Sequence, residues 1–545
     1  MTYRAARDVR CYVPGWPCWP AYGVAAILLL PLVSLFGGEE TVSEPPVSAA
    51  LPSTAFTVTG DRAFPWPAFV ATVAVAAGAA SLAVLVGGLV AVALELTDLP
   101  ARSFWGTAML VAFACPSAVW AMGQVYCYGP SGLADRWLGD AWRAWLANRD
   151  KGHYLSAVLV LGEIHAPLAM LLVGRGLVRL PQAGWEAARL SLPWILRWRW
   201  LLGAVRTELA AAWLLAFALS AGNFAVPHVL QCRLFPIELY LRLTNYLDRL
   251  GASLLALALL TVTLLAAAAV ALFEGRVPTA GGEAVADQRE SHRTALGRYR
   301  WVVVAALGLY LAITVVLPVG AMAVEVGSVS NFLSAVREAA PETANTLGTA
   351  LAAASLALIA GAIVGRAAAR KRILPLEHAA LVPIAVPALV LGLAYSQFYN
   401  RAGMLGLRWL GDGNALIILG LTARAWPFAA RAMMSGEQQI APACHEAAWL
   451  AGLGRARRAR WITAPLLANP ALAGGLVAYL LTVGEVEISQ LLCAPGRGTL
   501  ALRLFTFLHF GPVHVAASLA LLQLALAVLP VLAYFLFTNR CLAVV

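Results

Sequence analysis

Long apolar runs constrain the fold of this chain more than any other feature. The clearest run extends from Gly251 to Phe273 and contains no ionisable side chain. A bilayer core is about 30 Å thick, and a helix of about 20 mostly apolar residues crosses it. Of the 545 residues, 61% are hydrophobic and 12% are charged, against about a quarter charged in a soluble domain. The sequence therefore predicts an all-α polytopic membrane protein.

We expect twelve transmembrane helices, and an even number places both termini on one side. The predicted spans are residues 20–37, 66–97, 102–126, 154–176, 204–229, 251–273, 301–325, 343–369, 376–398, 414–434, 466–491 and 512–537. The first run follows Arg4, Arg7 and Arg10 and so resembles a signal peptide. Because further spans follow throughout, we interpret it as a retained first span.

The basic residues indicate the orientation. Cytoplasmic loops of membrane proteins carry an excess of Lys and Arg. With the N-terminus inside, the inner loops hold Arg175, Arg179, Arg189, Arg197, Arg199, Arg206, Arg289, Arg293, Arg298, Arg300, Arg370, Lys371, Arg372, Arg455, Arg457, Arg458 and Arg460. We therefore expect cytoplasmic N- and C-termini in a cell membrane, the inner membrane of a bacterium. We attribute the net charge of +11 to the basic residues that fix the membrane orientation, and we expect no nucleic acid partner.

One outer loop departs from this bias. It carries Arg136, Arg143, Arg149 and Lys151, partly balanced by Asp135, Asp140 and Asp150. Leu138, Trp142, Trp145 and Leu146 of this loop fall on one helical face, which predicts a short helix at the outer interface. Two of the eight cysteines, Cys127 and Cys232, are expected on the outer side. The sequence is compatible with a disulfide between them and with two free thiols.

An internal repeat divides the chain into two halves. RWLGD occurs at residues 136–140 and again at 408–412, and Pro116 and Pro387 lie at matching depths in the third and ninth spans. Pro167 and Pro427 are 260 residues apart, as are Glu186 and Glu446. We expect two homologous six-span halves, residues 1–273 and 301–545, joined by a polar cytoplasmic linker over residues 274–300.

A polar patterned segment interrupts the second half between residues 439 and 467. Glu446, Ala447 and Ala448 are followed by Gly452, and then by Ile462 and Pro465. Pro442 suits a first helical turn, and Gly452 permits a sharp reversal, so two short helices at an angle are expected. The first half repeats the start of this pattern with Glu186, Ala187 and Ala188, but Leu192 and Val205 occupy the glycine and final proline positions.

This spacing resembles the cytoplasmic coupling loop of ATP-binding-cassette importer permeases, the type I importers with a MetI-like transmembrane domain. The resemblance implies a permease that does no chemistry itself and needs no cofactor or metal. It also implies two cytoplasmic ATPase subunits as partners, an extracytoplasmic substrate-binding protein and the lipid bilayer. No phosphate-binding GxxxxGK[ST] loop occurs, since the only lysines are Lys151 and Lys371. Glu186 and Glu446 with their neighbours are then the ATPase-coupling residues.

Fusion of two halves, together with the third-span segments ACPSAVWAMGQVY and AVPALVLGLAY, resembles the ferric-iron and thiamine branch of these permeases. Ionisable groups inside spans are costly unless they face a cavity or a partner. The candidates for a translocation path are Asn223, Glu485, Glu487, Glu163, His165 and Arg424. For each of them there are two interpretations, a structural hydrogen bond between helices and a contact with substrate.

Two other classes of protein fit a chain of this kind. A major-facilitator transporter also has twelve spans in two halves with a central inner linker. Its usual glycine and basic signature between the second and third spans is absent from ELTDLPARSFW, residues 95–105. A membrane scaffold without transport activity is the other alternative, and the ionisable residues within spans argue against it.

Overall fold

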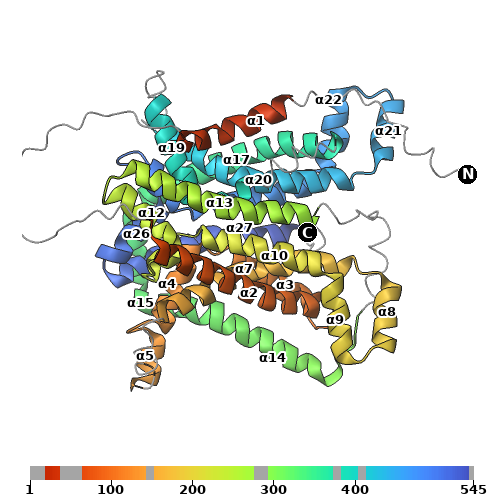
Figure 1. The fold of residues 1–545 in the computed structure, drawn as a ribbon, viewed down its shortest axis with the longest axis horizontal. Helices are drawn as coiled ribbons and strands as arrows, with labels where there is room; N and C mark the ends of the chain where they lie inside the picture. The colour runs from red at the N-terminus through yellow and green to blue at the C-terminus, as the bar shows by residue number, and fades with distance from the viewer. Residues whose placement is uncertain are drawn as a thin grey trace, which may run out of the picture.

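The computed structural model describes residues 19–36, 64–140, 142, 152–274, 293–371, 382–402 and 413–538. These residues form helices and short connections, with one isolated bridge between Thr97 and Thr294 and no strand among them. Most helices run roughly side by side in one bundle (Figure 1). The architecture confirms the all-α class that the apolar runs predict.

The first half contains thirteen described helices. They are α1 (Trp19–Leu29), η2 (Leu30–Phe36), α2 (Trp66–Leu96), α3 (Arg102–Phe113), α4 (Ser117–Tyr128), α5 (Leu133–Leu138), α7 (Gly152–Val178), α8 (Gln182–Ser191), α9 (Trp194–Ala204), α10 (Arg206–Ala221), α11 (Ala225–Val229), α12 (Phe235–Thr244) and α13 (Arg249–Glu274).

The remaining described helices follow the linker. They are η3 (Gly297–Tyr299), α14 (Arg300–Leu311), η4 (Ala312–Val316), α15 (Leu317–Val326), α16 (Val329–Glu338), α17 (Ala340–Lys371), η5 (Val382–Ala385), α19 (Ala388–Ala402), α20 (Ala415–Gln439), α21 (Pro442–Leu450), α22 (Arg455–Arg458), η8 (Ala459–Thr463), α23 (Ala464–Leu466), α24 (Ala468–Val483), α25 (Glu487–Leu492), α26 (Leu500–Phe510) and α27 (Val513–Thr538).

Six helices within the described residues are long and apolar enough to cross a membrane, or up to nine spans if each of three bent pairs counts as one. The apolar helices over residues 20–35 and 388–399 are shorter, and α20 coincides with the tenth predicted span. Residues 376–381 of the ninth predicted span lie outside the described residues. The fifth and eleventh predicted spans are wrong as single helices, because α10 ends at Ala221 and α24 ends at Val483, before each predicted span does. The chain is a multi-pass membrane protein, and the count of twelve stays a prediction.

The third predicted span, residues 102–126, is wrong as a single continuous helix. α3 and α4 meet at an angle of 98°, with Pro116 immediately before α4. Proline has no backbone N–H and its ring clashes with the preceding helical turn, so it breaks a helix at this point. The fifth and eleventh spans also adjoin bends, of 65° between α9 and α10 and 67° between the helix ending at residue 466 and α24.

Each half contains a closely packed helix pair, α2 with α7 and α17 with α20. A Cβ added to Gly87 of α2 would lie 2.2 Å from Ala166 O, and one added to Gly361 of α17 would lie 2.6 Å from Ala430 N. Helices in a membrane gain no hydrophobic driving force from water when they associate, so they depend on close packing. Small residues allow this close approach. These two pairs form the rigid centre of each half.

The first span of each half packs against the other half. Ser34 Oγ of η2 donates to Ala394 O (2.9 Å), and Tyr395 OH of α19 donates to Leu28 O (3.0 Å). In the reciprocal contact, a Cβ on Gly123 of α4 would lie 3.0 Å from Pro318 Cβ of α15. The halves are therefore interleaved rather than merely adjacent.

The end of the predicted linker returns to the first half. Thr294 N donates to Leu96 O (2.8 Å), and Leu296 N donates to Asp98 Oδ1 (2.7 Å). Residues 275–292 of the linker lie outside the described residues. The second half therefore starts from a fixed point beside the connection between α2 and α3.

The expected outer loop is described only in part. α5 ends at Leu138, Arg136 forms an ion pair with Glu325, and Trp142 Nε1 donates to Tyr128 O (3.3 Å). Trp145 and Leu146 lie outside the described residues, as does the second RWLGD segment. Cys127 and Cys232 are both free, and Cys232 Sγ donates to His153 O (3.1 Å), so free thiols rather than a disulfide are present.

We predict that Gly361→Leu lowers the free energy of unfolding by about 1–3 kcal/mol, because the added side chain forces α17 away from α20. Thermal unfolding of the purified chain in detergent measures the effect. Gly348→Leu is the matched control, since a Cβ at this exposed glycine of the same helix meets nothing within 4 Å. Equal melting temperatures for the two variants would contradict the close-packing account.

Candidate functional site

The patterned segment of the second half forms a helical hairpin, here called the second hairpin and made of α21, α22, η8 and α23. Pro442 lies in the first turn of α21, as its fixed φ favours. Gly452 follows α21 with φ +70°, its N–H donates to Trp449 O (2.9 Å), and Leu453 N donates to Ala448 O (3.1 Å). These two bonds and the left-handed glycine form a Schellman motif. The reversal predicted at Gly452 is confirmed.

The first half builds the same shape without glycine. Its first hairpin consists of α8 and α9, joined through Leu192 in extended conformation (φ −106°, ψ 139°) and Pro193. The rings of Trp185 and Trp200 stack with centroids 6.2 Å apart and hold α8 against α9. The loop that departs from the repeat in sequence therefore keeps its geometry, with proline supplying the break.

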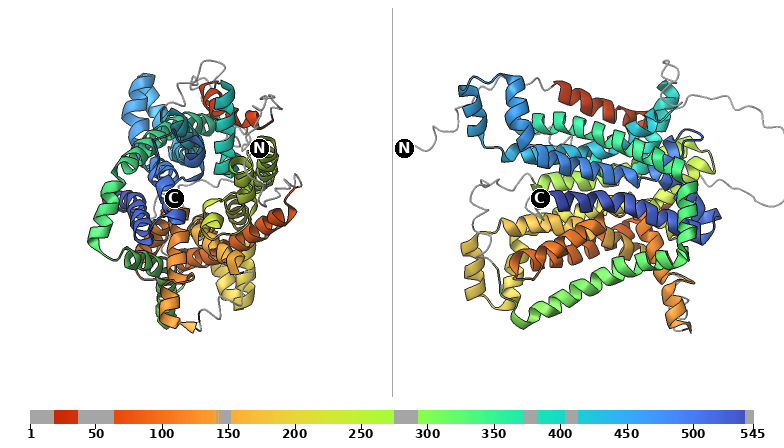
Figure 2. Two further views of the ribbon diagram at one scale, coloured as in Figure 1. Left: turned by 90° about the vertical axis from the view of Figure 1, so that its left-hand side faces the viewer. Right: turned by 180° about the vertical axis from the view of Figure 1, so that it is seen from behind.

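Both hairpins project from the same end of the bundle, here called the hairpin end (Figures 1 and 2). Each exposes a carboxylate and an alanine, Glu186 with Ala187 and Glu446 with Ala447. Large apolar side chains beside them are also exposed, with Leu190 at 89% and Leu450 at 78%. The second alanines differ, since Ala188 and Ala448 are each only 4% exposed and pack inward.

The exposed apolar residues of the hairpins matter because large exposed apolar patches on a folded protein mark interaction sites. Trp194 is 67% exposed on the first hairpin, and Trp449 (64%) and Trp461 (70%) are exposed on the second. Together with the two glutamates they make each hairpin a small surface with an acidic and an apolar part. This composition suits contact with another protein or with the membrane interface.

A second candidate region lies where the halves meet. A Cβ on Gly222 would lie 3.0 Å from Pro387 Cβ, and one on Gly484 would lie 2.5 Å from Pro116 Cβ. The two contacts are reciprocal. In each, a glycine at the end of the fifth span of one half meets the proline at the break in the third span of the other half. The two prolines that the repeat pairs, Pro116 and Pro387, thus make equivalent contacts with glycines of the opposite half.

The polar residues after these glycines lie at this interface. Glu487 is 6% exposed, and its Oε1 accepts from Phe224 N of the other half (2.9 Å). Glu485 Oε1 accepts from Glu487 N (3.2 Å), and Asn223 Oδ1 accepts from Val226 N (2.9 Å). The interface therefore joins the halves through charged and polar groups as well as through small residues.

Arg424 completes this group of residues from α20. Its guanidinium attracts both Glu485 and Glu487, and its Nη1 donates to Val386 O (2.7 Å), just before Pro387. Glu487 is held on both sides of the interface, whereas Glu485 is partly accessible. The structure thus brings together four of the six predicted path residues: Asn223, Arg424, Glu485 and Glu487.

The other two predicted path residues have structural partners within the first half. Glu163 Oε2 of α7 accepts from Trp120 Nε1 (3.2 Å) and Gln124 Nε2 (3.0 Å) of α4. His165 Nδ1 hydrogen-bonds Ser220 Oγ (3.0 Å) of α10. Both residues join neighbouring helices, which is the alternative that stayed open for them.

Sequence reasoning missed a reciprocal pair of threonines. Thr72 Oγ1 of α2 accepts from Phe235 N (2.8 Å) at the start of α12, and Thr346 Oγ1 of α17 accepts from Leu500 N (2.7 Å) at the start of α26. Aligning the second span of each half would have revealed them as a repeated feature.

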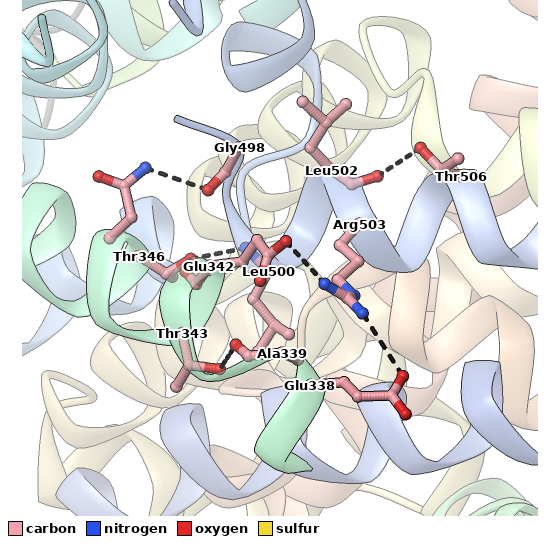
Figure 3. Close-up of polar contacts among 11 residues, drawn as sticks. Glu338, Ala339, Glu342, Thr343, Thr346, Gly498, Leu500, Leu502, Arg503 and Thr506 are labelled. Atoms are coloured by element: carbon pink, nitrogen blue, oxygen red, sulfur yellow. Dashed lines mark hydrogen bonds and ion pairs between the residues drawn. The ribbon is translucent and has the colours of Figure 1, made fainter. Parts of the chain in front are cut away.

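An ion-pair network at the opposite end was also missed. Arg503 of α26 pairs with Glu342 (2.7 Å) and more loosely with Glu338 (3.9 Å), as Figure 3 shows. Asn345 Nδ2 donates to Gly498 O (3.1 Å) beside an open depression of about 310 Å³. These bonds hold α26 on α16 and α17. Arg503 is the only charged residue in 498–506, and a single arginine in an apolar stretch gave no signal of this contact.

The fold and these two regions define a multi-pass all-α membrane protein with paired hairpins at one end and a polar interface between its halves. No known family profile matches the chain. Two curated proteins are similar to parts of it. It is 28% identical over 173 residues to the sulfoquinovosyl glycerol transport system permease protein SmoG of Agrobacterium fabrum, a match that covers 28% of this chain and 56% of the relative.

The other relative is the probable sulfate transport system permease protein cysT of Nephroselmis olivacea, 28% identical over 193 residues, covering 32% of this chain and 67% of that protein. The chain thus spans just over half of the first relative and about two thirds of the second. Both relatives are permeases of transport systems and not enzymes. The similarity supports the permease class, and it does not extend to ferric-iron or thiamine specificity.

We predict that Gly452→Ala weakens the Schellman motif, because a residue with a Cβ costs about 1–2 kcal/mol in the left-handed conformation. Hydrogen exchange should speed up about tenfold at the amides of residues 452 and 453. Gly454→Ala is the matched control, since Gly454 has equal space and no positive φ. Faster exchange in both variants, or in neither, would contradict this reading of the turn.

We predict that Glu487→Leu destabilises the chain by about 1–3 kcal/mol, because Phe224 N–H is left buried without its acceptor. Glu487→Gln keeps an acceptor oxygen and should lose less. Thermal unfolding of both variants in detergent measures the difference. If leucine is tolerated as well as glutamine, the bond across the interface does not hold the halves together.

Proposed function

We propose that this chain is the permease subunit of an ATP-binding-cassette importer. The observation that carries the proposal is the pair of matched hairpins at one end, each with an exposed glutamate beside exposed apolar side chains. In the proposal each hairpin docks on one of two ATPase subunits. Glu186, Ala187, Glu446 and Ala447 contact the ATPases directly, whereas Ala188, Ala448 and Gly452 shape the hairpins from within.

The helices that follow the hairpins are the levers of this mechanism. α10 and α24 each have 16 residues, about 24 Å of helix, and run from a hairpin to the interface glycines Gly222 and Gly484. A rigid helix carries a displacement at one end to the other. ATP-driven closure of the ATPases then shifts the contacts between the halves and alternates access to the polar residues there.

The hairpin end faces the cytoplasm in this proposal, together with both chain termini. The arginines of the hairpins and of the start of α14 support this orientation, because cytoplasmic loops are enriched in basic residues. The opposite end, with α5, α12 and α26, then faces an extracytoplasmic substrate-binding protein. The membrane is a cell membrane, the inner membrane of a bacterium.

The translocation path in this proposal passes the interface of the halves at Asn223, Arg424 and Glu485. Glu487 positions this group, while Glu163 and His165 stabilise the helices around it. Burial of two carboxyl groups beside one guanidinium disfavours a second negative charge, so charge alone does not select the substrate here. Ferric iron and thiamine are the first substrates to test because of the resemblance of the sequence, whereas the relatives' names carry sulfoquinovosyl glycerol and sulfate.

We predict that Glu186→Arg together with Glu446→Arg abolishes retention of a co-expressed ATPase partner, because both docking carboxylates become cations. Co-purification on the tagged permease measures retention. Asp140→Arg at the opposite end is the matched control, since it makes the same charge change on an exposed side chain.

Undiminished retention by the double variant would overturn the docking role of the hairpins. The class of transporter is tested separately in proteoliposomes that contain the whole complex. Uptake that requires ATP supports the importer, and uptake driven by a proton gradient without ATP would instead establish a secondary transporter.

A further inference from the structure

A largely apolar crevice lies among the membrane helices, away from the hairpins and from the interface carboxylates. Its volume is about 630 Å³, within the usual range of ligand sites of about 300–1,000 Å³. Its walls come from α3, α4, α14, η4, α15 and α27, and include Trp105, Val111, Gly123, Gly308, Val315 and Leu524. Nothing in the proposed transport cycle uses this space.

The crevice exists because α14 diverges from the bundle. At η4 the carbonyls of Ile313 and Thr314 accept hydrogen bonds from Tyr128 OH (2.8 Å) and Gln124 Nε2 (3.3 Å) of α4. Gly123 allows Pro318 to approach on the same side. α15 is thereby fixed to α4, while α14 runs at an angle along the edge of the bundle towards the hairpin end (Figures 1 and 2).

The polar side chains that line the crevice are already paired within the protein. Trp105 Nε1 donates to Pro100 O (3.2 Å), Trp120 Nε1 to Glu163 Oε2 (3.2 Å), and Thr314 Oγ1 to Tyr310 O (2.8 Å). A polar solute would lose its hydrogen bonds to water here and gain none, which is unfavourable. The chemistry of the walls therefore selects a hydrocarbon occupant.

The surroundings of the crevice indicate where this hydrocarbon comes from. In the apolar 18-residue window of the span over residues 297–326, only 11% of the residues are buried within the protein, so most of this window faces outward, towards lipid. At the hairpin end of the same span Arg298 and Arg300 are exposed, beside Tyr299 and Trp301 at 61% and 60% exposure. Aromatic residues of this kind mark the membrane interface. Arg300 is eight residues from Gly308, about 12 Å along the helix, so a headgroup there can have its chain in the crevice.

We propose that this crevice binds one anionic phospholipid, with an acyl chain between α3, α14 and α27 and its phosphate at Arg298 and Arg300. The lipid fills space that would otherwise separate the first span of the second half from the first half. It is therefore a bound component of the interleaved contact between the halves. This assignment does not depend on the proposed transport function.

Native mass spectrometry tests the proposal on the full chain in detergent with added phosphatidylglycerol or phosphatidylcholine of identical chains. We expect one retained phosphatidylglycerol, with a preference of about tenfold over phosphatidylcholine. Arg298→Glu with Arg300→Glu should abolish the preference. Arg337→Glu with Arg497→Glu, two exposed arginines outside the crevice, is the matched control and should keep it.

Ala312→Trp fills the crevice and should remove the retained lipid, whereas Leu265→Trp on the exposed face of α13 should not. Equal retention of the two headgroups, a retained free fatty acid instead of a phospholipid, or lipid retention by Ala312→Trp would overturn the assignment. If that variant does not fold, a phosphatidylglycerol with a diazirine in its acyl chain decides on the wild type. Labelling concentrated in α3, α14 and α27 supports the site, and labelling spread evenly over the exposed helices contradicts it.

Discussion

Two glycine–proline contacts govern how the halves of this protein meet. A Cβ at Gly484 would lie 2.5 Å from Pro116 Cβ and would force the halves to shift, and one at Gly222 would lie 3.0 Å from Pro387 Cβ, a tight contact. Each proline also breaks its own span or begins a helix, so one residue type both creates the bend and forms the contact. The reciprocity is that of a two-fold interface built within a single chain.

The contacts between the halves and the hairpins form one mechanical unit in each half. A bend of 65° or 67° joins each hairpin to the helix that follows it, α10 or α24. Each of these helices has 16 residues and ends at an interface glycine. In the proposed mechanism, the closely packed pairs α2–α7 and α17–α20 provide the frame beside which these helices move. The interleaved first spans would keep the halves associated during such a motion. On this proposal a hairpin far from the interface carboxylates acts on them through its helix.

The sequence predicted the features that follow from local chemistry and from the repeat. Apolar runs located the helices, Gly452 located its turn, and matching depths in the third and ninth spans paired Pro116 with Pro387. The sequence did not predict that the third span is broken by 98°, because proline permits a small kink as well as a complete break. Nor did it distinguish Glu487, bonded across the interface, from Glu163, bonded within one half. Partners distant in sequence decide such roles, and the contact of Arg503 with Glu342 is another example.

The central claim is that a nucleotide cycle on bound ATPases moves the two hairpins relative to each other. Spin labels at Arg199→Cys on the first hairpin and Arg457→Cys on the second, both exposed and outside the docking carboxylates, report the separation of the hairpins by pulsed electron paramagnetic resonance. The native cysteines, including exposed Cys444, are replaced in this chain. In the complex with ATPase subunits, the account predicts a shorter distance with a non-hydrolysable ATP analogue than without nucleotide. An identical distance distribution in both states would contradict it.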